Sequence, residues 1–166
     1  MNDQPKIRIR NAKHSDLNSI IEVENSAFPP ERQATIETFA NRLALNEKGF
    51  LVLEYEGQIV AFSTAFLTNN ITNIKDFDIP DEQLHNPKGI IFELRSIAVK
   101  KDYQKKGFGK LLLFKQLENA TILKKKFFRF TAASDVARFY EKMGFRRISP
   151  YHNFHNSKQA IWEKKL

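Results

Sequence analysis

The 166-residue chain contains no cysteine, and this absence excludes several kinds of chemistry. Without a thiol, the protein forms no disulfide, builds no cysteine-based zinc site and carries no acyl group on a cysteine. A chain without cysteine also suits the reducing cytoplasm. We therefore predict a cytoplasmic protein in which any acyl transfer proceeds without a protein thiol, and we expect no metal site.

The sequence also lacks any apolar run of the length that crosses a membrane, and its first residues include charged side chains. Neither a membrane span nor a secretory signal is expected. Internal repeats and linkers are absent too, so residues 1–166 are expected to form one domain. The 42% hydrophobic content, with 15 phenylalanines, is sufficient for a sizeable core.

Positive charge is in excess, because 27 lysines and arginines stand against 19 acidic residues and give a net charge of +8. Such an excess is typical of proteins that meet nucleic acid, acidic protein surfaces or a polyanionic cofactor. The run at 124–126 is interpreted as a solvated surface. The lysines at 100, 101, 105, 106 and 110 surround a pair of glycines, where the phosphates of a nucleotide would lie.

Hydrophobic periodicity and turn residues predict alternating strands and helices. Strands are expected at residues 6–10, 50–54, 59–66, 90–99, 127–132, 145–149 and 160–164, and helices at 15–28, 35–46, 111–123 and 134–143. No linker divides this order of elements. The polar stretch 67–89 is long for a connection, which indicates a lid or a substrate loop.

The most informative stretch is residues 99–110, which read V-K-K-D-Y-Q-K-K-G-F-G-K between an apolar strand and a helix. Gly107 and Gly109 allow the backbone to turn sharply and to approach a ligand. The start of the helix presents N–H groups and the positive end of its dipole to the same place. Successive N–H groups so arranged bind anions such as phosphates.

Two better-known phosphate loops do not fit this stretch. A P-loop would need glycine at Gln104 and serine or threonine at Leu111, and a dinucleotide fingerprint would need its third glycine at Leu112. What fits is the pattern Q-x-x-G-x-G at residues 104–109 after a strand that ends at Val99, which resembles the pyrophosphate loop of the GNAT acetyltransferase superfamily. The alternative is an ordinary helix-start turn with solvated lysines.

This resemblance implies that the chain binds acetyl-CoA as a cosubstrate. It implies contacts from the loop and from the end of the strand, where the sheet is expected to splay and expose backbone groups to pantetheine. The residues so assigned are Ile97, Ala98, Val99, Gln104, Lys105, Lys106, Gly107, Phe108, Gly109 and Lys110.

A second motif, F-Y-x-x-x-G-F at residues 139–145, resembles the last conserved segment of GNAT enzymes. In that family, the tyrosine at the position of Tyr140 lies near the cofactor sulfur and protonates the departing thiolate. A phenol with a pKa of about 10 keeps its proton until a thiolate needs it. The alternative is that Phe139, Met143 and Phe145 are core residues beside a glycine cap.

Two further segments resemble the arylalkylamine N-acetyltransferase branch of the family. They are the L-H-x-P-x-G pattern at 84–89 and the loop that begins Phe28-Pro29-Pro30. The resemblance implies that Phe28, Pro29, Pro30 and His85 contribute to the acceptor site. His85 is also compatible with a loop position without chemistry.

The chain departs from the animal arylalkylamine enzymes at Glu93 and Arg95, which stand where those enzymes have two histidines that relay a proton. Glu93 is a chemically sensible base, because it lies on the central strand and shares a face with Arg95. Its alternative is a surface carboxylate or a salt bridge with Arg95. The acidic residues at positions 76, 78, 81 and 82 are expected to be solvated or to attract a cationic amine.

Together, these resemblances imply the GNAT fold, an α/β (α+β) architecture with a twisted, mostly antiparallel sheet flanked by helices. They imply an acetyl-CoA-dependent N-acetyltransferase that transfers acetyl directly to a small primary amine, with Glu93 and Tyr140 as catalytic residues. A protein or peptide amine as acceptor, a binding module with a basic face and a CoA sensor without turnover stay open. We expect no membrane and no nucleic acid among its partners, and a homodimer is left open.

Overall fold

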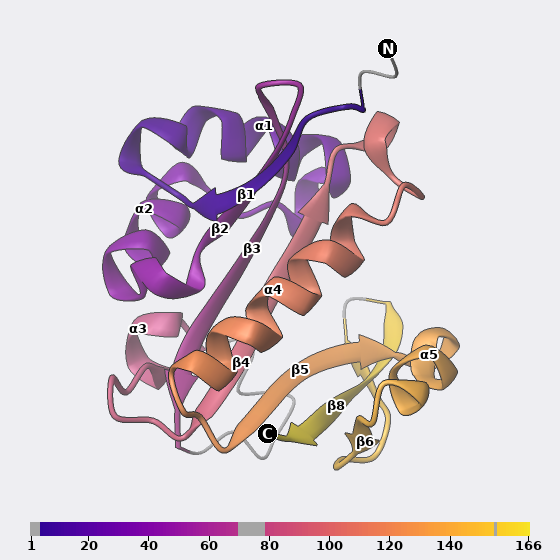
Figure 1. Ribbon diagram of the computed structural model, residues 1–166. Coiled ribbons are helices and arrows are strands. Elements are labelled where there is room, and N and C mark those ends of the chain that lie inside the picture. The colour runs from indigo at the N-terminus through magenta and orange to yellow at the C-terminus, as the bar shows by residue number, and fades with distance from the viewer. Residues whose placement is uncertain (1–3, 70–78, 155) are drawn as a thin grey trace. The chain divides into compact units, whose positions relative to one another are not determined.

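Figure 1 shows the computed structural model, which describes residues 4–69, 79–154 and 156–166. The chain divides into two compact units. Unit 1 comprises Met1–Ala65 and Ser96–Asn119, and unit 2 comprises Phe66–Arg95 and Ala120–Leu166. Two strands and one helix continue from one unit into the other, and each unit is described by itself below.

The helices are α1 (Leu17–Ala27), α2 (Ile36–Leu45), α3 (Asp81–Leu84), α4 (Phe108–Ile122) and α5 (Ala137–Lys142). The strands are β1 (Ile7–Asn11), β2 (Leu51–Tyr55), β3 (Gln58–Thr68), β4 (Ile91–Val99), β5 (Phe127–Ala133), β6 (Arg146–Arg147), β7 (His152–Phe154) and β8 (Ser157–Lys165). Strands β3 and β4 and helix α4 contribute residues to both units.

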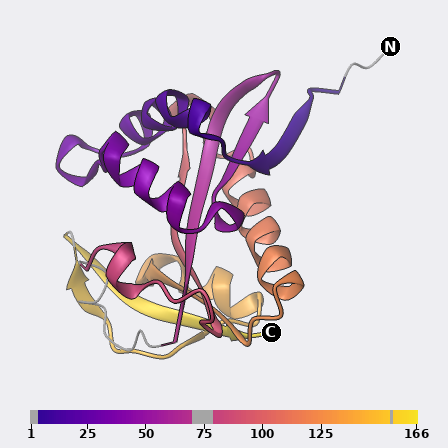
Figure 2. The same ribbon diagram turned by 90° about the vertical axis from the view of Figure 1, so that its left-hand side faces the viewer.

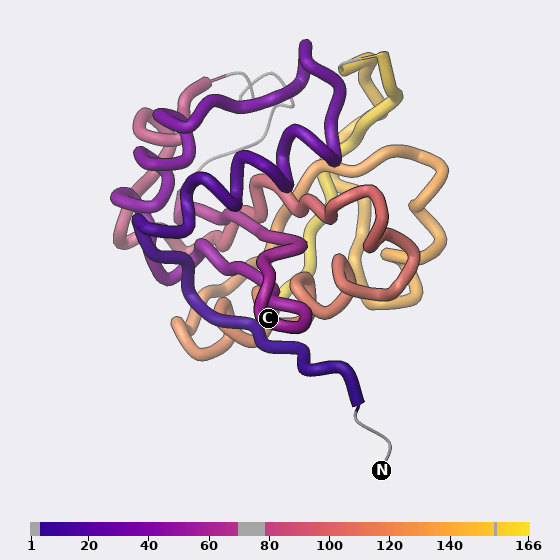
Figure 3. Tube along the Cα trace, turned by 90° about the horizontal axis from the view of Figure 1, so that it is seen from above, coloured from indigo at the N-terminus to yellow at the C-terminus, as the bar shows by residue number. Residues whose placement is uncertain are grey.

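In unit 1, β1, β2 and β3 form consecutive antiparallel pairs. Helices α1 and α2 cover one face of these strands and α4 lies on the other face (Figure 2). The chain of α1 and α2 can also be followed from above in Figure 3. Between this helix pair and the strands lies a core that includes Ile20, Val23, Phe39 and Phe62, all fully buried. The rings of Phe39 and Phe62 meet edge to face at 5.1 Å.

Local sequence explains where these elements begin and turn. The Thr35 hydroxyl accepts a hydrogen bond from the N–H of Thr38 and so caps α2, as its residue type favours. Glu56 and Gly57 both have positive φ, at 50° and 80°. Two such residues between paired strands make a tight hairpin turn. The strands predicted at 50–54 and 59–66 are therefore joined by a hairpin.

Gln116 is a fully buried polar residue on α4, a helix with apolar side chains on most sides. Its amide nitrogen donates to the carbonyl of Gly49 and to the hydroxyl of Ser63, both at 2.8 Å. A buried amide is tolerated where it finds such partners. Gln116 therefore fastens α4 to the start of β2 and to β3 within unit 1.

In unit 2, β4 pairs with β5 in parallel over Ile91–Glu93, and β8 pairs with β5 in antiparallel register. Strands β6 and β7 both pair with β8 in antiparallel register. Because one pair is parallel and the others are antiparallel, the sheet is mixed and mostly antiparallel. The α/β fold class predicted from the sequence is confirmed.

The two faces of the unit 2 strands differ in chemistry, because neighbouring residues of a strand point to opposite faces. One face is aromatic: Phe92 stacks on Phe128 at 5.4 Å, and Phe130 stands opposite Trp162. The other face carries the charged residues of the site described below. Phe145 packs on the aromatic face against Phe128 and Phe130.

Several sequence predictions need correction. Phe139 is a core residue in the alternative interpretation of its motif, but it is 43% exposed, because α5 has only six residues. The strand expected at 145–149 is only the two-residue β6 in the structure. Helix α3 and strand β7 were not predicted from the sequence. The predicted lid at 67–89 overlaps residues 70–78, which lie outside the described residues, as do Asp76 and Asp78.

Among the helices of the described ranges, none combines the length and the apolar composition that a membrane crossing requires.

Candidate functional site

The glycine-rich turn is built in unit 1 between β4 and α4. After Val99, a short 3₁₀ turn leads into residues with positive φ at Lys105 (62°) and Gly107 (84°). Glycine adopts such an angle without strain, and a Cβ at Gly107 would meet nothing within 4 Å. The position therefore requires glycine for the backbone angle and not for lack of space.

Three of the predicted loop residues play different structural roles. The amide of Gln104 donates to the carbonyl of Val99 at 3.0 Å, so it fastens the loop to the end of β4. The ring of Phe108 is only 4% exposed and packs in the unit 1 core, so only its backbone is left for a ligand. A Cβ at Gly109 would lie 3.7 Å from Ile97, an ordinary contact.

This loop has the features of an anion cradle. The first N–H groups of α4 have no partner within the helix, and the positive end of the helix dipole lies there. Lys105, Lys106 and Lys110 are all exposed beside it, and Gly107 is exposed as well. The turn thus combines free backbone donors with mobile positive charges, which suits a pyrophosphate.

The loop that begins with Phe28 is fastened to the end of α1 in unit 1. The carboxylate of Glu24, which is buried, accepts the N–H of Ala34 at 3.0 Å. The amide of Gln33 donates to the carbonyl of Phe28 at 2.8 Å. Pro29 and Pro30 are exposed and start a 3₁₀ turn that the two bonds enclose. The predicted acceptor loop is therefore a defined structure.

The L-H-x-P-x-G segment is fastened to the end of β3 in unit 2. His85 Nδ1 accepts the N–H of Leu67 at 3.2 Å, and Asn86 N–H donates to the carbonyl of Leu67 at 2.7 Å. Gly89 is needed for close approach, since a Cβ there would lie 2.4 Å from the backbone of Thr68. Burial lowers the pKa of His85. The contact occupies Nδ1, so Nε2 is the atom of His85 that a ligand would meet.

Glu93 is fully buried on β4, and neither of its carboxylate oxygens has a hydrogen-bond partner among the described residues. The predicted alternatives, a surface carboxylate or a salt bridge with Arg95, are therefore wrong. Arg95 lies 3.1 Å from Asp81 of α3 instead, nitrogen to carboxylate oxygen. Burial raises the pKa of Glu93 to about 8, and the nearby charges of Arg129 and Arg95 lower it by less.

Glu93 belongs to a row of charges across four neighbouring strands of unit 2. It stands opposite Arg129 of β5, which stands opposite Glu163 of β8, which in turn stands opposite Arg146 of β6. The Arg129 guanidinium donates to Glu163 at 2.5 Å, and Arg146 reaches the other oxygen of Glu163 at 3.3 Å. Glu163 is therefore held from both sides, whereas Glu93 is not.

Tyr140 lies half-buried on α5 in unit 2. Its ring packs on Phe130 at 4.5 Å, with Phe145 at 6.1 Å and Trp162 at 6.3 Å. Burial raises the pKa of its phenol. The described residues offer its hydroxyl no hydrogen bond. Aromatic packing thus fixes the ring of Tyr140 and leaves its hydroxyl without a hydrogen bond among the described residues. The hydroxyl keeps its proton at neutral pH, as a general acid requires.

The structure brings some predicted residues together and keeps others apart. In unit 1, the loop residues from Gln104 to Lys110 form one site with the end of β4. In unit 2, Glu93 and Tyr140 lie on opposite faces of the strands, because Tyr140 packs on Phe130 and Glu93 stands beside Arg129, the neighbour of Phe130. A proton removed at Glu93 and a proton given by Tyr140 would therefore move on different sides of the sheet.

Sequence reasoning missed Arg129 and Glu163. It gave Asp81 as a solvated charge or one that attracts a cationic amine, and the solvated reading is wrong because Asp81 is buried against Arg95. No local pattern could have joined them to Glu93, since strand register alone makes Glu93, Arg129 and Glu163 neighbours. Alternation in the segment 127–133 was the one usable signal, because it separates Arg129 from the aromatic residues on either side.

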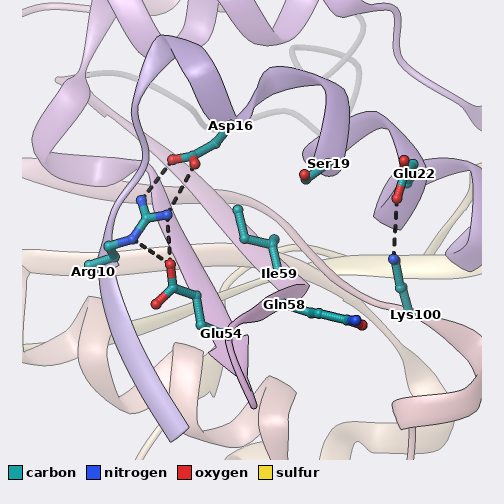
Figure 4. Close-up of a pocket in the computed structure, with 9 residues that line it drawn as sticks. Arg10, Asp16, Ser19, Glu22, Glu54, Gln58, Ile59 and Lys100 are labelled. Atoms are coloured by element: carbon teal, nitrogen blue, oxygen red, sulfur yellow. Dashed lines mark hydrogen bonds and ion pairs between the residues drawn. The ribbon is translucent and has the colours of Figure 1, made fainter.

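Unit 1 also contains a polar hollow of about 450 Å³ that none of the predicted site residues lines (Figure 4). Arg10 reaches into it and binds both Asp16 and Glu54, while Lys100 pairs with Glu22 at 3.4 Å. Arg10 and Lys100 are both paired with carboxylates within the hollow, which is typical of a structural network. The described parts of the chain contain no cluster of three or more histidine or acidic side chains able to hold a metal ion.

Comparison with known proteins adds to this geometry. A family model described as "Acetyltransferase (GNAT) domain" matches residues 46–147. An "N-alpha-acetyltransferase" of Sulfurisphaera tokodaii is 24% identical over 152 residues, which covers 89% of this chain and 85% of the relative.

Two solved structures are similar in fold. One is titled "GphF GNAT-like decarboxylase in complex with isobutyryl-CoA", with a TM-score of 0.77 and 21% identity over 95% of this chain and 98% of the other. The second is yncA of Salmonella typhimurium, described as a putative acetyltransferase "with its cofactor Acetyl-CoA". Its TM-score is 0.70, with 17% identity over 96% and 94% of the two chains. At these identities the likeness concerns the fold alone.

The buried carboxyl group of Glu93 should make the free energy of unfolding depend on pH. Since its pKa rises from 4.5 in the unfolded chain to about 8 in the folded one, unfolding releases a proton between these pH values. The free energy of unfolding should then fall as pH rises from about 4.5 to about 8, and level off above. The loss is on the order of a few kcal/mol.

The variant Glu93→Gln cannot ionise, so its free energy of unfolding, measured by urea denaturation from pH 5 to pH 9, should lack that fall. Glu118→Gln, which removes an exposed carboxylate from α4, serves as the control and should keep the wild-type pH dependence. Parallel pH curves for the wild type and Glu93→Gln would show that Glu93 is ionised in the folded protein throughout.

Proposed function

Because the chain belongs to the GNAT acetyltransferase family and is an acetyl-CoA-dependent N-acetyltransferase, we propose that its acceptor is a small primary amine. We place it with the arylalkylamine N-acetyltransferase branch and treat residues 1–166 as one transferase domain. The observation that carries the proposal is Glu93, a buried carboxyl group whose pKa of about 8 suits a base that works near neutral pH.

The proposed cosubstrate site uses backbone groups and lysines. The N–H groups at the start of α4 and the turn at Gly107 would bind the pyrophosphate, and Lys105, Lys106 and Lys110 would add charge attraction. Backbone groups of Ile97, Ala98 and Val99 would bind pantetheine. This assignment is supported by the positive φ of Gly107 and by the exposure of the lysines.

In the proposed reaction, the neutral amine attacks the thioester carbonyl, so that a C–N bond forms and the C–S bond breaks. Glu93 accepts a proton from the amine, through a water molecule where the two do not touch, since the carboxyl group has no exposed area. Tyr140 gives its phenolic proton to the CoA thiolate. Holding both substrates in one orientation supplies much of the rate acceleration.

The acceptor site is proposed at Phe28, Pro29, Pro30 and His85. The two prolines are exposed, and the loop is held by Glu24 and Gln33. A fixed loop suits a small ligand because it loses little freedom on binding. A protein N-terminus is the second candidate acceptor, favoured by the name of the curated relative. A cytoplasmic location stays a prediction of the sequence, and a homodimer stays open.

The Gly107→Val variant should bind acetyl-CoA at least about tenfold more weakly, because valine strains a backbone at φ 84° by roughly 1 to 3 kcal/mol. Isothermal titration calorimetry measures the affinity. Gly57→Val is a matched control, since Gly57 has φ 80° and open space but lies in the β2–β3 hairpin. If both variants fold and both keep wild-type affinity, the pyrophosphate is bound elsewhere.

The Tyr140→Phe variant keeps the ring that packs on Phe130 and loses only the hydroxyl. Turnover should fall by on the order of a hundredfold, while the dissociation constant of acetyl-CoA stays near the wild-type value. Tyr151→Phe, at a ring beside Arg147, is the control. A turnover for Tyr140→Phe within a few-fold of the wild type would make Tyr140 a packing residue.

The acceptor class is tested by comparing kcat/KM for 2-phenylethylamine, spermidine and short peptides with free alanine or serine N-termini. We expect one of the small amines to exceed every peptide by at least about tenfold, which corresponds to roughly 1.4 kcal/mol of transition-state binding. A preference for the peptides would replace the small amine by a protein N-terminus as the acceptor.

A further inference from the structure

The charged face of unit 2 holds two arginines beside Glu93, and each of them contacts a carboxylate, one of which, Glu163, is shared with the exposed Arg146. Arg129 contacts Glu163, and Arg95 lies 3.1 Å from Asp81. The four carboxylate and guanidinium partners are largely buried, with side-chain exposures between 4% and 13%. The ion pairs Arg129–Glu163 and Arg95–Asp81 therefore flank the Glu93 carboxyl group, which has no hydrogen bond among the described residues.

The charged groups near Glu93 in the described residues lie on four elements. Arg95 shares β4 with Glu93, Arg129 lies on β5, Glu163 on β8 and Asp81 on α3. Their formal charges sum to zero. Without the two carboxylates, the same place would hold two positive charges, and Glu93 would be drawn into an ion pair with one of them.

Strand register places Glu93 in one row with Glu163. Glu163 stands opposite Arg129 in the β5–β8 ladder, and Arg129 stands opposite Glu93 in the β4–β5 ladder. Arg129 thus lies between two carboxyl groups of the same row. It contacts Glu163 and leaves both oxygens of Glu93 without a hydrogen-bond partner.

We propose that Glu163 and Asp81 are positioning residues for Glu93: by neutralising Arg129 and Arg95, they keep the Glu93 carboxyl group out of an ion pair and free to exchange a proton. This inference rests on the proposed function in which Glu93 is the base. It adds that two carboxylates, one on β8 and one on α3, determine the charge environment of the base without themselves contacting a substrate.

The test is the titration of the Glu93 carboxyl carbon by NMR, in protein with ¹³C-labelled glutamate, where Glu93→Gln identifies its signal. In Glu163→Gln, the midpoint should fall by about one to three pH units from the wild-type value, because Arg129 becomes free to attract Glu93. Asp81→Asn should lower it through Arg95. This second variant keeps the proposal testable if Glu163→Gln does not fold.

Two controls make the shift specific. Glu118→Gln removes an exposed carboxylate that pairs with Lys115, and it should leave the midpoint of Glu93 unchanged. The double variant Arg129→Gln with Glu163→Gln removes both charges of the pair, and the midpoint should return toward the wild-type value. A midpoint that stays at the wild-type value in both Glu163→Gln and Asp81→Asn would overturn the proposal.

The pH dependence of kcat/KM separates this inference from the proposed function. If Glu93 is the base, the acid limb of the profile moves down in Glu163→Gln by the same number of pH units as the NMR midpoint. An NMR midpoint that moves while the acid limb stays supports the charge arrangement and removes Glu93 from the role of base. The NMR midpoint therefore tests the charge arrangement, and the acid limb of kcat/KM tests Glu93 as the base.

Discussion

The burial of Glu93 is the constraint on which unit 2 depends. A carboxyl group that is withdrawn from water and left without a hydrogen bond costs several kcal/mol if it ionises, so it keeps its proton instead. The cost that remains is offset by the apolar face of the same strands, where Phe92, Phe128 and Trp162 are buried almost completely. One face of the strands thus supplies the stability that permits an unusual group on the other.

In unit 1, the main constraint is a turn whose backbone conformation most residues avoid. Lys105 and Gly107 have positive φ, and the chain around them is fixed by the bond from Gln104 to Val99 and by the buried ring of Phe108. These contacts lie on the side of the core. They leave the lysines and the helix start on the exposed side, so stability and ligand binding use different atoms of one short segment.

The sequence was informative where chemistry is local. Gly107 was predicted to allow a sharp turn and has a positive φ, an effect that reaches only a few residues along the chain. The row of Glu93, Arg129 and Glu163 was not predictable in this way. Its members are 34 or more residues apart, and they meet only because the register of two ladders places them in line.

The same distinction explains the errors at α5 and at Glu93. Apolar spacing suggested that Phe139 is a core residue, but a helix of six residues has too little surface to bury all its apolar side chains. For Glu93, the sequence offered Arg95 two residues away as a partner on the same face. Asp81 holds Arg95 instead, and that contact depends on how α3 meets β4, which propensities do not determine.

The separation of Glu93 and Tyr140 onto opposite faces has a consequence for the proton balance of the proposed reaction. In each cycle Glu93 gains a proton and Tyr140 loses one, so Glu93 has to release its proton and Tyr140 has to regain one, while the net proton of an ammonium substrate is lost when the neutral amine forms. Tyr140 is half-buried and can exchange with solvent directly, but Glu93 has no exposed area. On the proposed mechanism, the proton of Glu93 therefore leaves through a neighbouring group or a water molecule and not directly to solvent.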